Sequence, residues 1–139
     1  MLIEGGCFLD ERGGVQFVND FDMTLIKRFY LISHSNTNVV RAWQGHKIEN
    51  RWFYCVEGSF DIRLVKINNW DYPSDDLPVE KFILDSSKPK VLRIQNGYVN
   101  GIKALTKNSK LIVFSDYKLG DNINDEFRFD NNRWTNWND

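Results

Sequence analysis

The sequence is poor in the features that mark disulfide-rich, metal-binding or membrane proteins. It has two cysteines, Cys7 and Cys55, far apart and inside apolar segments. We therefore expect buried thiols rather than a disulfide or paired metal ligands. No apolar run approaches the roughly 20 residues that span a bilayer. Residues 1–6, MLIEGG, lack the pattern of a secretory signal peptide, so we expect a soluble cytoplasmic protein.

The sequence also lacks an excess of charge of either sign. The 139 residues carry 18 basic and 19 acidic side chains, a net charge of −1, and no run of basic residues. This balance disfavours nucleic acid and anionic membranes as partners. No linker, repeat or low-complexity segment divides the chain. We therefore predict one domain over residues 1–139, with a polar tail at 121–139 that wraps it.

Aromatic residues are abundant, at 14% with five Trp and ten Phe, and helical periodicity is scarce. Such rings typically fill the space between β-sheets. Alternating segments separated by turn residues predict about ten strands and an all-β, antiparallel jelly roll or barrel. The predicted strands cover residues 7–9, 15–18, 26–32, 39–43, 51–57, 60–67, 82–84, 91–94, 101–105 and 110–114.

The hairpin at 39–60 organises the functional part of the sequence. Its first strand ends in a crowd of polar residues, Arg41, Gln44, His46 and Lys47. Polar groups on rigid strands, pointing into an aromatic interior, suit a small polar ligand. The alternative is a hairpin with a charged tip.

The strand at 26–32 alternates so that Arg28 and Tyr30 share a face with two isoleucines. This mixed face predicts the wall of a pocket. His34 follows in a polar loop, where we expect it to face solvent.

Several segments resemble a known family: residues 10–13 (DERG), 26–32 (IKRFYLI), 39–47 (VVRAWQGHK), Gly58 and 93–105 (RIQNGYVNGIKAL). They are similar to cupin-fold enzymes that act on dTDP-4-keto-6-deoxy sugars. These include dTDP-4-dehydrorhamnose 3,5-epimerase and, closer in layout, the dTDP-sugar 3,4-ketoisomerases of the WxcM-like and FdtA-like group. The resemblance extends to about Tyr117. It implies a cupin jelly roll and a homodimer.

The two cupin motifs fall on Gln44, His46, Arg51 and Gly58, and on Gln95, Gly97 and Asn100. Metal-dependent cupins place ligands at four of these positions, three of which are Gln44, Arg51 and Asn100 here. One histidine cannot hold a divalent metal, and an arginine repels it. We therefore expect no metal and no cofactor, which disfavours a metal-dependent dioxygenase or isomerase.

The resemblance also implies catalytic roles. In these enzymes a histidine near the first motif removes the proton beside the C4 ketone, which needs a base and a partner for the enolate. The first histidine of that motif is Gln44 here, and the later histidine of the epimerases is Asn100. His46 remains as the candidate base and Tyr30 as the proton donor. The alternatives are a strand-end histidine bonded to the backbone and ordinary core packing of Tyr30.

The substrate-binding candidates are the residues that would hold a dTDP-linked sugar. A guanidinium can clamp a pyrophosphate in two places, so Arg41 is the first candidate unless it pairs with a carboxylate. Aromatic rings at alternate positions can stack on a sugar or thymine, but they more often belong to the core. The set is Arg41, Lys47, Arg28, Gln44, Arg51, Asn100, Trp43 and Tyr98.

The sequence thus leads to a metal-independent isomerase or epimerase of a dTDP-4-keto-6-deoxyhexose in surface-polysaccharide assembly. The alternative is a catalytically silent cupin that binds a sugar or sugar nucleotide.

Overall fold

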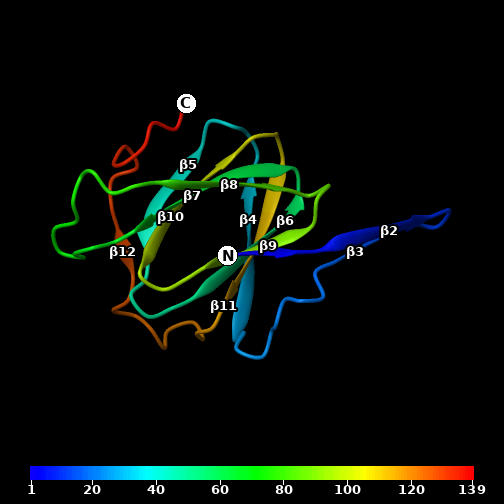
Figure 1. Ribbon diagram of the computed structural model, residues 1–139, viewed down its shortest axis with the longest axis horizontal. Coiled ribbons are helices and arrows are strands. Elements are labelled where there is room, and N and C mark those ends of the chain that lie inside the picture. Colours follow the sequence, from blue (N-terminus) through cyan, green and yellow to red (C-terminus); the bar gives the residue numbers. More distant parts are fainter.

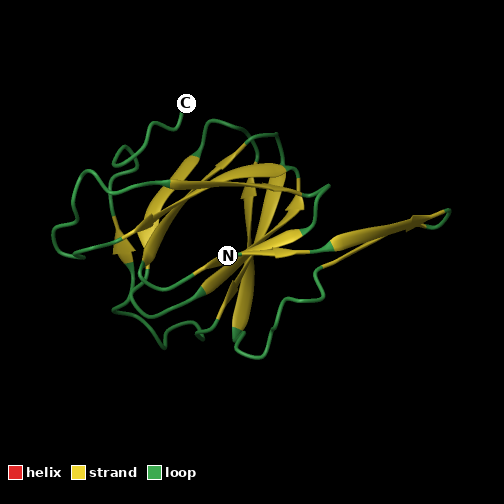
Figure 2. Cartoon of the chain, viewed as in Figure 1, coloured by secondary structure: helices red, strands yellow, loops and turns green.

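The computed structural model describes all residues, 1–139, and contains strands but no helix (Figures 1 and 2). The strands are β1 (Leu2–Glu4), β2 (Gly6–Asp10), β3 (Gly13–Phe17), β4 (Arg28–His34), β5 (Val40–Gly45), β6 (Arg51–Glu57), β7 (Ser59–Lys66), β8 (Glu80–Asp85), β9 (Lys90–Ile94), β10 (Tyr98–Ala104), β11 (Ser109–Ser115) and β12 (Phe127–Arg128). No stretch is a helix of the length and apolar character needed to cross a membrane.

Ten of the strands form two five-stranded antiparallel sheets, in the orders β1-β9-β6-β11-β4 and β12-β5-β10-β7-β8. The chain passes back and forth between them: β4, β6, β9 and β11 belong to the first sheet, and β5, β7, β10 and β12 to the second. This alternation is the jelly-roll winding, so the predicted all-β antiparallel cupin fold is confirmed.

The core lies between the sheets because each strand points its alternate apolar residues inward. The first sheet contributes Phe53, Cys55, Leu92, Ile94, Leu111 and Val113, and the second contributes Phe60, Ile62, Leu64, Leu84, Ile102 and Ala104. Only Phe53 and Phe60 of these twelve residues are aromatic, so the expectation that the aromatic rings fill the space between the sheets is met only in part.

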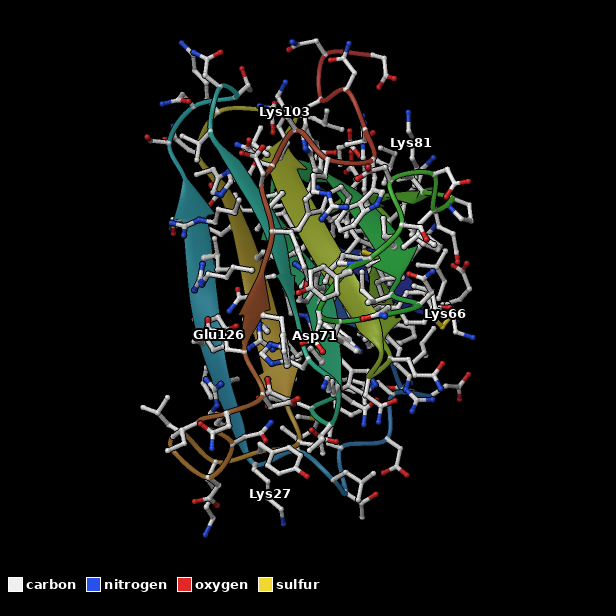
Figure 3. The ribbon with its side chains drawn as sticks, turned by 90° about the vertical axis from the view of Figure 1, so that its left-hand side faces the viewer. Lys27, Lys66, Asp71, Lys81, Lys103 and Glu126 are labelled. Carbon is white, nitrogen blue, oxygen red and sulfur yellow. The ribbon has the colours of Figure 1, made fainter.

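A second, smaller core covers the outer face of the second sheet. Trp43 packs there against Trp134 and Trp137 of the tail, with ring centroids 5.5 and 5.6 Å apart. Arg63, buried on the same face, donates to the Asn136 carbonyl at 2.9 Å and stacks on Trp137. The tail runs across this face beside β5, ending near Lys81 and Lys103 (Figure 3). Its last residues are thus held against the sheet that contains β5.

The hairpin of β2 and β3 projects from the body (Figure 1). Cys7 lies on it and is exposed, so its predicted burial is wrong, whereas Cys55 is buried as predicted. A two-stranded hairpin has no second layer to cover its side chains, which explains the difference.

All ten predicted strands are found within three residues at each end, and β6 matches at both ends. The predicted hairpin at 39–60 is wrong, because β5 and β6 lie in different sheets and do not pair; the polar turn between them carries the chain from one sheet to the other. The sequence did not predict β1 or β12, which are short edge strands recognisable only from their pairing partners. The prediction for His34 is wrong: it ends β4, pairs with Ser109 of β11, and is 2% exposed.

Candidate active site

Two adjoining hollows lie beside β5 and the polar turn that follows it. The larger, of about 590 Å³, is lined from β4, β5, β6, β10 and β12. The smaller, of about 450 Å³, is lined mainly by β4, β5, β6 and the segment that precedes β12. Tyr30, Gln44 and Arg51 line both, so the two form one groove with a shared wall.

The structure brings eight of the ten predicted site residues to this groove. Arg41, Asn100 and Trp43 line the larger hollow, Arg28 and His46 line the smaller, and Tyr30, Gln44 and Arg51 belong to both. Lys47 and Tyr98 line neither: the Lys47 ammonium lies over the Phe127 ring, and Tyr98 packs against the main core.

His46 is buried directly after β5, at the start of the turn that leads to β6. Its Nδ1 lies 2.7 Å from the backbone oxygen of Asp125, and its Nε2 has no hydrogen-bond partner. Because a carbonyl only accepts, Nδ1 must carry the proton, and Nε2 holds the lone pair. Burial lowers the pKa of His46, and the nearby charge of Arg51 lowers it further. The ring is therefore neutral near pH 7.

Asp125 of the tail fixes the position of this turn. Its carboxylate accepts hydrogen bonds from the backbone N–H groups of Lys47, Ile48 and Glu49, at 2.7 to 3.0 Å. Burial works against this charge, but these bonds, and one from Asn122, hold the pKa of Asp125 below its usual value. A segment about 80 residues away in sequence thus holds both the His46 ring and the loop behind it.

A buried ion pair flanks His46. Arg51 donates from Nε to Oε2 of Glu49 at 2.5 Å, and that oxygen lies 4.0 Å from His46 Nε2. Burial opposes the Glu49 charge, but Arg51 holds the pKa of Glu49 below its usual value. A carboxylate at this distance stabilises a protonated imidazole.

Tyr30 stands between two cationic groups. The guanidinium carbons of Arg28 and Arg51 lie 5.1 and 5.9 Å from the centre of its ring. These cation–π contacts fix the ring at the wall common to both hollows.

Arg41 has a different environment. It forms no ion pair, and its Nε donates to Nε2 of His34 at 3.2 Å. A guanidinium without a carboxylate beside a cavity is free to bind an anion.

Gln44 and Asn100, which occupy the two positions where the epimerase pattern has histidine, face each other across β5 and β10. The Gln44 amide donates to Glu126 at 2.5 Å, and Glu126 also pairs with Arg128. Figure 3 shows Glu126 on the tail between β4 and β12. Nowhere in the chain do three or more His, Cys, Asp and Glu side chains gather as metal ligands.

Trp43 does not present its ring to the groove. It is 1% exposed and packs in the second core, with Nε1 donating to the Arg133 carbonyl at 3.0 Å. Trp43 is therefore a core residue, the alternative to stacking on a sugar or thymine that its place in the strand left open.

The site also contains residues that the sequence reading missed, namely His34, Glu49, Asp125 and Glu126. Glu49 lies only two residues before Arg51, so the ion pair could have been proposed from spacing. Asp125 and Glu126 carried no signal, because their roles depend on β12 pairing with β5.

The solved structures that share this fold over most of the chain include one epimerase and two 3,4-ketoisomerases. The RmlC epimerase of Mycobacterium tuberculosis has a TM-score of 0.73 and 17% identity, and the match covers 92% of this chain and 67% of that one. The QdtA 3,4-ketoisomerase of Thermoanaerobacterium thermosaccharolyticum, in complex with TDP, has a TM-score of 0.70 and 22% identity, over 93% of this chain and 87% of that one. The WlaRB TDP-quinovose 3,4-ketoisomerase of Campylobacter jejuni has a TM-score of 0.67 and 20% identity, over 93% of this chain and 92% of that one.

No curated protein matches the sequence. The family described as WxcM-like, C-terminal matches residues 2–134, nearly the whole chain, in agreement with the motifs read from the sequence. The chain therefore belongs to the WxcM-like family.

Proposed function

We propose that the protein isomerises a dTDP-linked 4-keto-6-deoxyhexose without a cofactor, as a step of nucleotide-sugar metabolism in surface-polysaccharide biosynthesis. The observation that carries the proposal is the groove itself. It places a neutral imidazole with a free Nε2 near a tyrosine and, farther along, an arginine without a counter-ion. The family and the printed activities of the structural neighbours support it.

In this proposal His46 is the base. The substrate ketone acidifies the neighbouring C–H, so the protein must supply a base whose pKa suits neutral pH and a group that stabilises the enolate. The lone pair on Nε2 takes the proton, and Glu49 stabilises the resulting imidazolium. Tyr30, held by Arg28 and Arg51, donates to the oxygen on which charge develops.

Three of the remaining candidates bind substrate. Arg41 contacts the diphosphate from the larger hollow. Arg28 and Asn100 hold the sugar.

A single base favours 3,4-ketoisomerisation over 3,5-epimerisation. The positions of the two other histidines hold Gln44 and Asn100, whose amides cannot take a proton. One imidazole can remove the proton from C3 and return it to C4 once the enediol has formed. Two epimerisations with opposite-face protonation require more acid–base groups than this groove supplies.

The experiment is incubation with dTDP-4-keto-6-deoxyglucose in D₂O, followed by mass spectrometry and NMR. The proposal predicts a new keto-sugar, deuterium beside the ketone, or both. Stabilisation of the native fold by dTDP in a thermal melt tests binding separately.

A silent sugar-nucleotide-binding cupin is the second candidate. The observation in its favour is that Gln44, at the position of the first histidine, is already engaged by Glu126. This candidate predicts stabilisation by dTDP with neither product nor exchange. No stabilisation at millimolar dTDP would count against both functions.

We also propose a homodimer. The outer faces of the β2–β3 hairpin and of the edge strand β4 expose Phe8, Leu9, Val15, Phe29 and Leu31, each more than half exposed. Edge strands and apolar faces of this kind need cover. Sedimentation equilibrium should give twice the mass of 16.4 kDa, and the monomer mass would contradict it.

A further inference from the structure

His34 is a buried histidine that the proposed chemistry does not use. It ends β4, is 2% exposed, and packs edge-to-face on Phe60 with ring centroids 5.6 Å apart. Its one hydrogen bond is to Arg41, whose Nε lies 3.2 Å from His34 Nε2.

The partner determines the tautomer of this ring. A guanidinium keeps its protons in proteins, so Arg41 Nε can only donate, and His34 Nε2 must hold the lone pair. The proton then sits on Nδ1, which is buried and has no partner. Burial and the charge of Arg41 both lower the pKa of His34, which keeps the ring neutral.

A buried N–H without a partner costs free energy, so stability alone does not account for a histidine here. An apolar side chain would fill the same space without that cost. What the imidazole adds is an acceptor for Arg41.

Arg41 benefits in a specific way. With Nε held by His34, its two terminal nitrogens have no partner within the chain, and Arg41 lines the larger hollow. A long side chain loses conformational freedom when it binds a ligand, and fixing it beforehand reduces that loss. The two terminal nitrogens form the edge with which a guanidinium binds phosphate oxygens bidentately.

We propose that His34 is a positioning residue that holds Arg41 for bidentate binding of a nucleotide diphosphate. This inference rests on the proposed function, which supplies the diphosphate. It adds that affinity for the phosphates depends on a neutral imidazole that does not touch the ligand.

The test compares dTDP with thymidine by calorimetry. His34→Leu should weaken dTDP binding by roughly 3- to 10-fold, the factor for re-ordering one long side chain, and should leave thymidine affinity unchanged. His34→Gln is the matched control, because its amide oxygen can accept from Arg41; it should retain most of the native dTDP affinity. In an Arg41→Gln background, His34→Leu should have no further effect.

The outcomes separate the two proposals. If the native protein binds dTDP and His34→Leu binds it equally well, the inference is wrong and the proposed function stands. Equal weakening of dTDP and thymidine would make His34 merely structural and would also overturn the inference. A native protein that does not bind dTDP overturns the proposed function and this inference with it.

A measurement on the native protein does not depend on the folding of any variant. Nitrogen-15 NMR of the imidazoles should show His34 as the Nδ1–H tautomer. A His34 ring that is protonated on Nε2 at neutral pH cannot accept from Arg41 and would overturn the inference.

Discussion

The two histidines of the chain differ in place and in the nitrogen that is bonded. His46 lines the smaller hollow and is bonded through Nδ1, whereas His34 lines neither hollow and is bonded through Nε2 to Arg41 of the larger one. Both are buried, both have lowered pKa values, and each has one ring nitrogen without a partner. His46 gives its N–H to a carbonyl and keeps a free lone pair on Nε2. His34 gives its lone pair to Arg41 and keeps a buried N–H.

This difference shows that the partner, rather than burial or pKa, determines what each ring can do. An acceptor beside one nitrogen makes the other nitrogen a base, whereas a donor beside it makes the ring an anchor. We therefore expect separable effects: substitution of His46 should act on the chemical step, and substitution of His34 on ligand affinity.

The largest expected effect is loss of the base. His46→Asn should lower the turnover of dTDP-4-keto-6-deoxyglucose by roughly 10²- to 10⁴-fold, the usual contribution of general acid–base catalysis. The dTDP affinity should stay within about twofold, because Arg41 and His34 are untouched. Turnover in NMR assays and calorimetry would measure the two quantities. Retained turnover, or a loss of dTDP affinity without a loss of turnover, would contradict the assignment of His46 as the base.

The next effect concerns the support of His46. Asp125→Ala leaves the N–H groups of Lys47, Ile48 and Glu49 without their acceptor, and should lower the free energy of unfolding by about 2–4 kcal/mol. Turnover should fall further than dTDP affinity. Urea denaturation measures the stability. Asp10→Ala, at the exposed turn of the first hairpin, is the control and should leave the midpoint unchanged.

A smaller effect tests the contact between Arg41 and His34. Arg41→Lys keeps the charge but loses both the Nε donor to His34 and the bidentate edge. Calorimetry should show dTDP binding weakened by about tenfold, with thymidine unaffected. Native affinity in this variant would mean that charge alone matters and that the His34 contact is incidental.

The smallest effect is on stability against pH. Both histidines have folded pKa values below the unfolded value of about 6.5. Above that pH neither state binds the protons; as pH falls toward the folded values, the unfolded state binds them first, so stability decreases. Urea melts at pH 7.5 and 5.5 should show the decline in the native protein and a shallower one in His34→Leu. An equal loss of stability between pH 7.5 and 5.5 in the native protein and in His34→Leu would show that His34 does not contribute to the pH dependence.

The sequence predicted the fold well because period-2 alternation is a local property. The strands could be located from their own residues, although in β6 both faces are largely apolar and alternation does not tell which one points inward. It failed where burial depends on distant segments. His34 follows a strand in a stretch of polar residues, yet Ser109 and Phe60 enclose it. Cys7 lies in an apolar strand, yet no second layer covers that hairpin.

The site was predictable only in part. Tyr30 lies on β4, Arg41 and Gln44 lie on β5, and His46 follows β5 directly. Alternation alone would put Arg41 and Gln44, three residues apart, on opposite faces of the sheet. A register shift between β5 and β10, which pairs Gln44 with Asn100 and Arg41 with Ile102, brings both to the groove. The orientation of each ring was not predictable, because it depends on Asp125 for His46 and on a cross-strand contact for His34.

The central claim is that His46 alone moves the proton between C3 and C4. The most direct measurement is proton NMR of dTDP-4-keto-6-deoxyglucose in D₂O with native protein and with His46→Asn. The account predicts that the native protein removes the C3–H signal and leaves the C5–H signal intact, while the variant preserves both. Loss of C5–H, or loss of C3–H at the native rate in the variant, would contradict it.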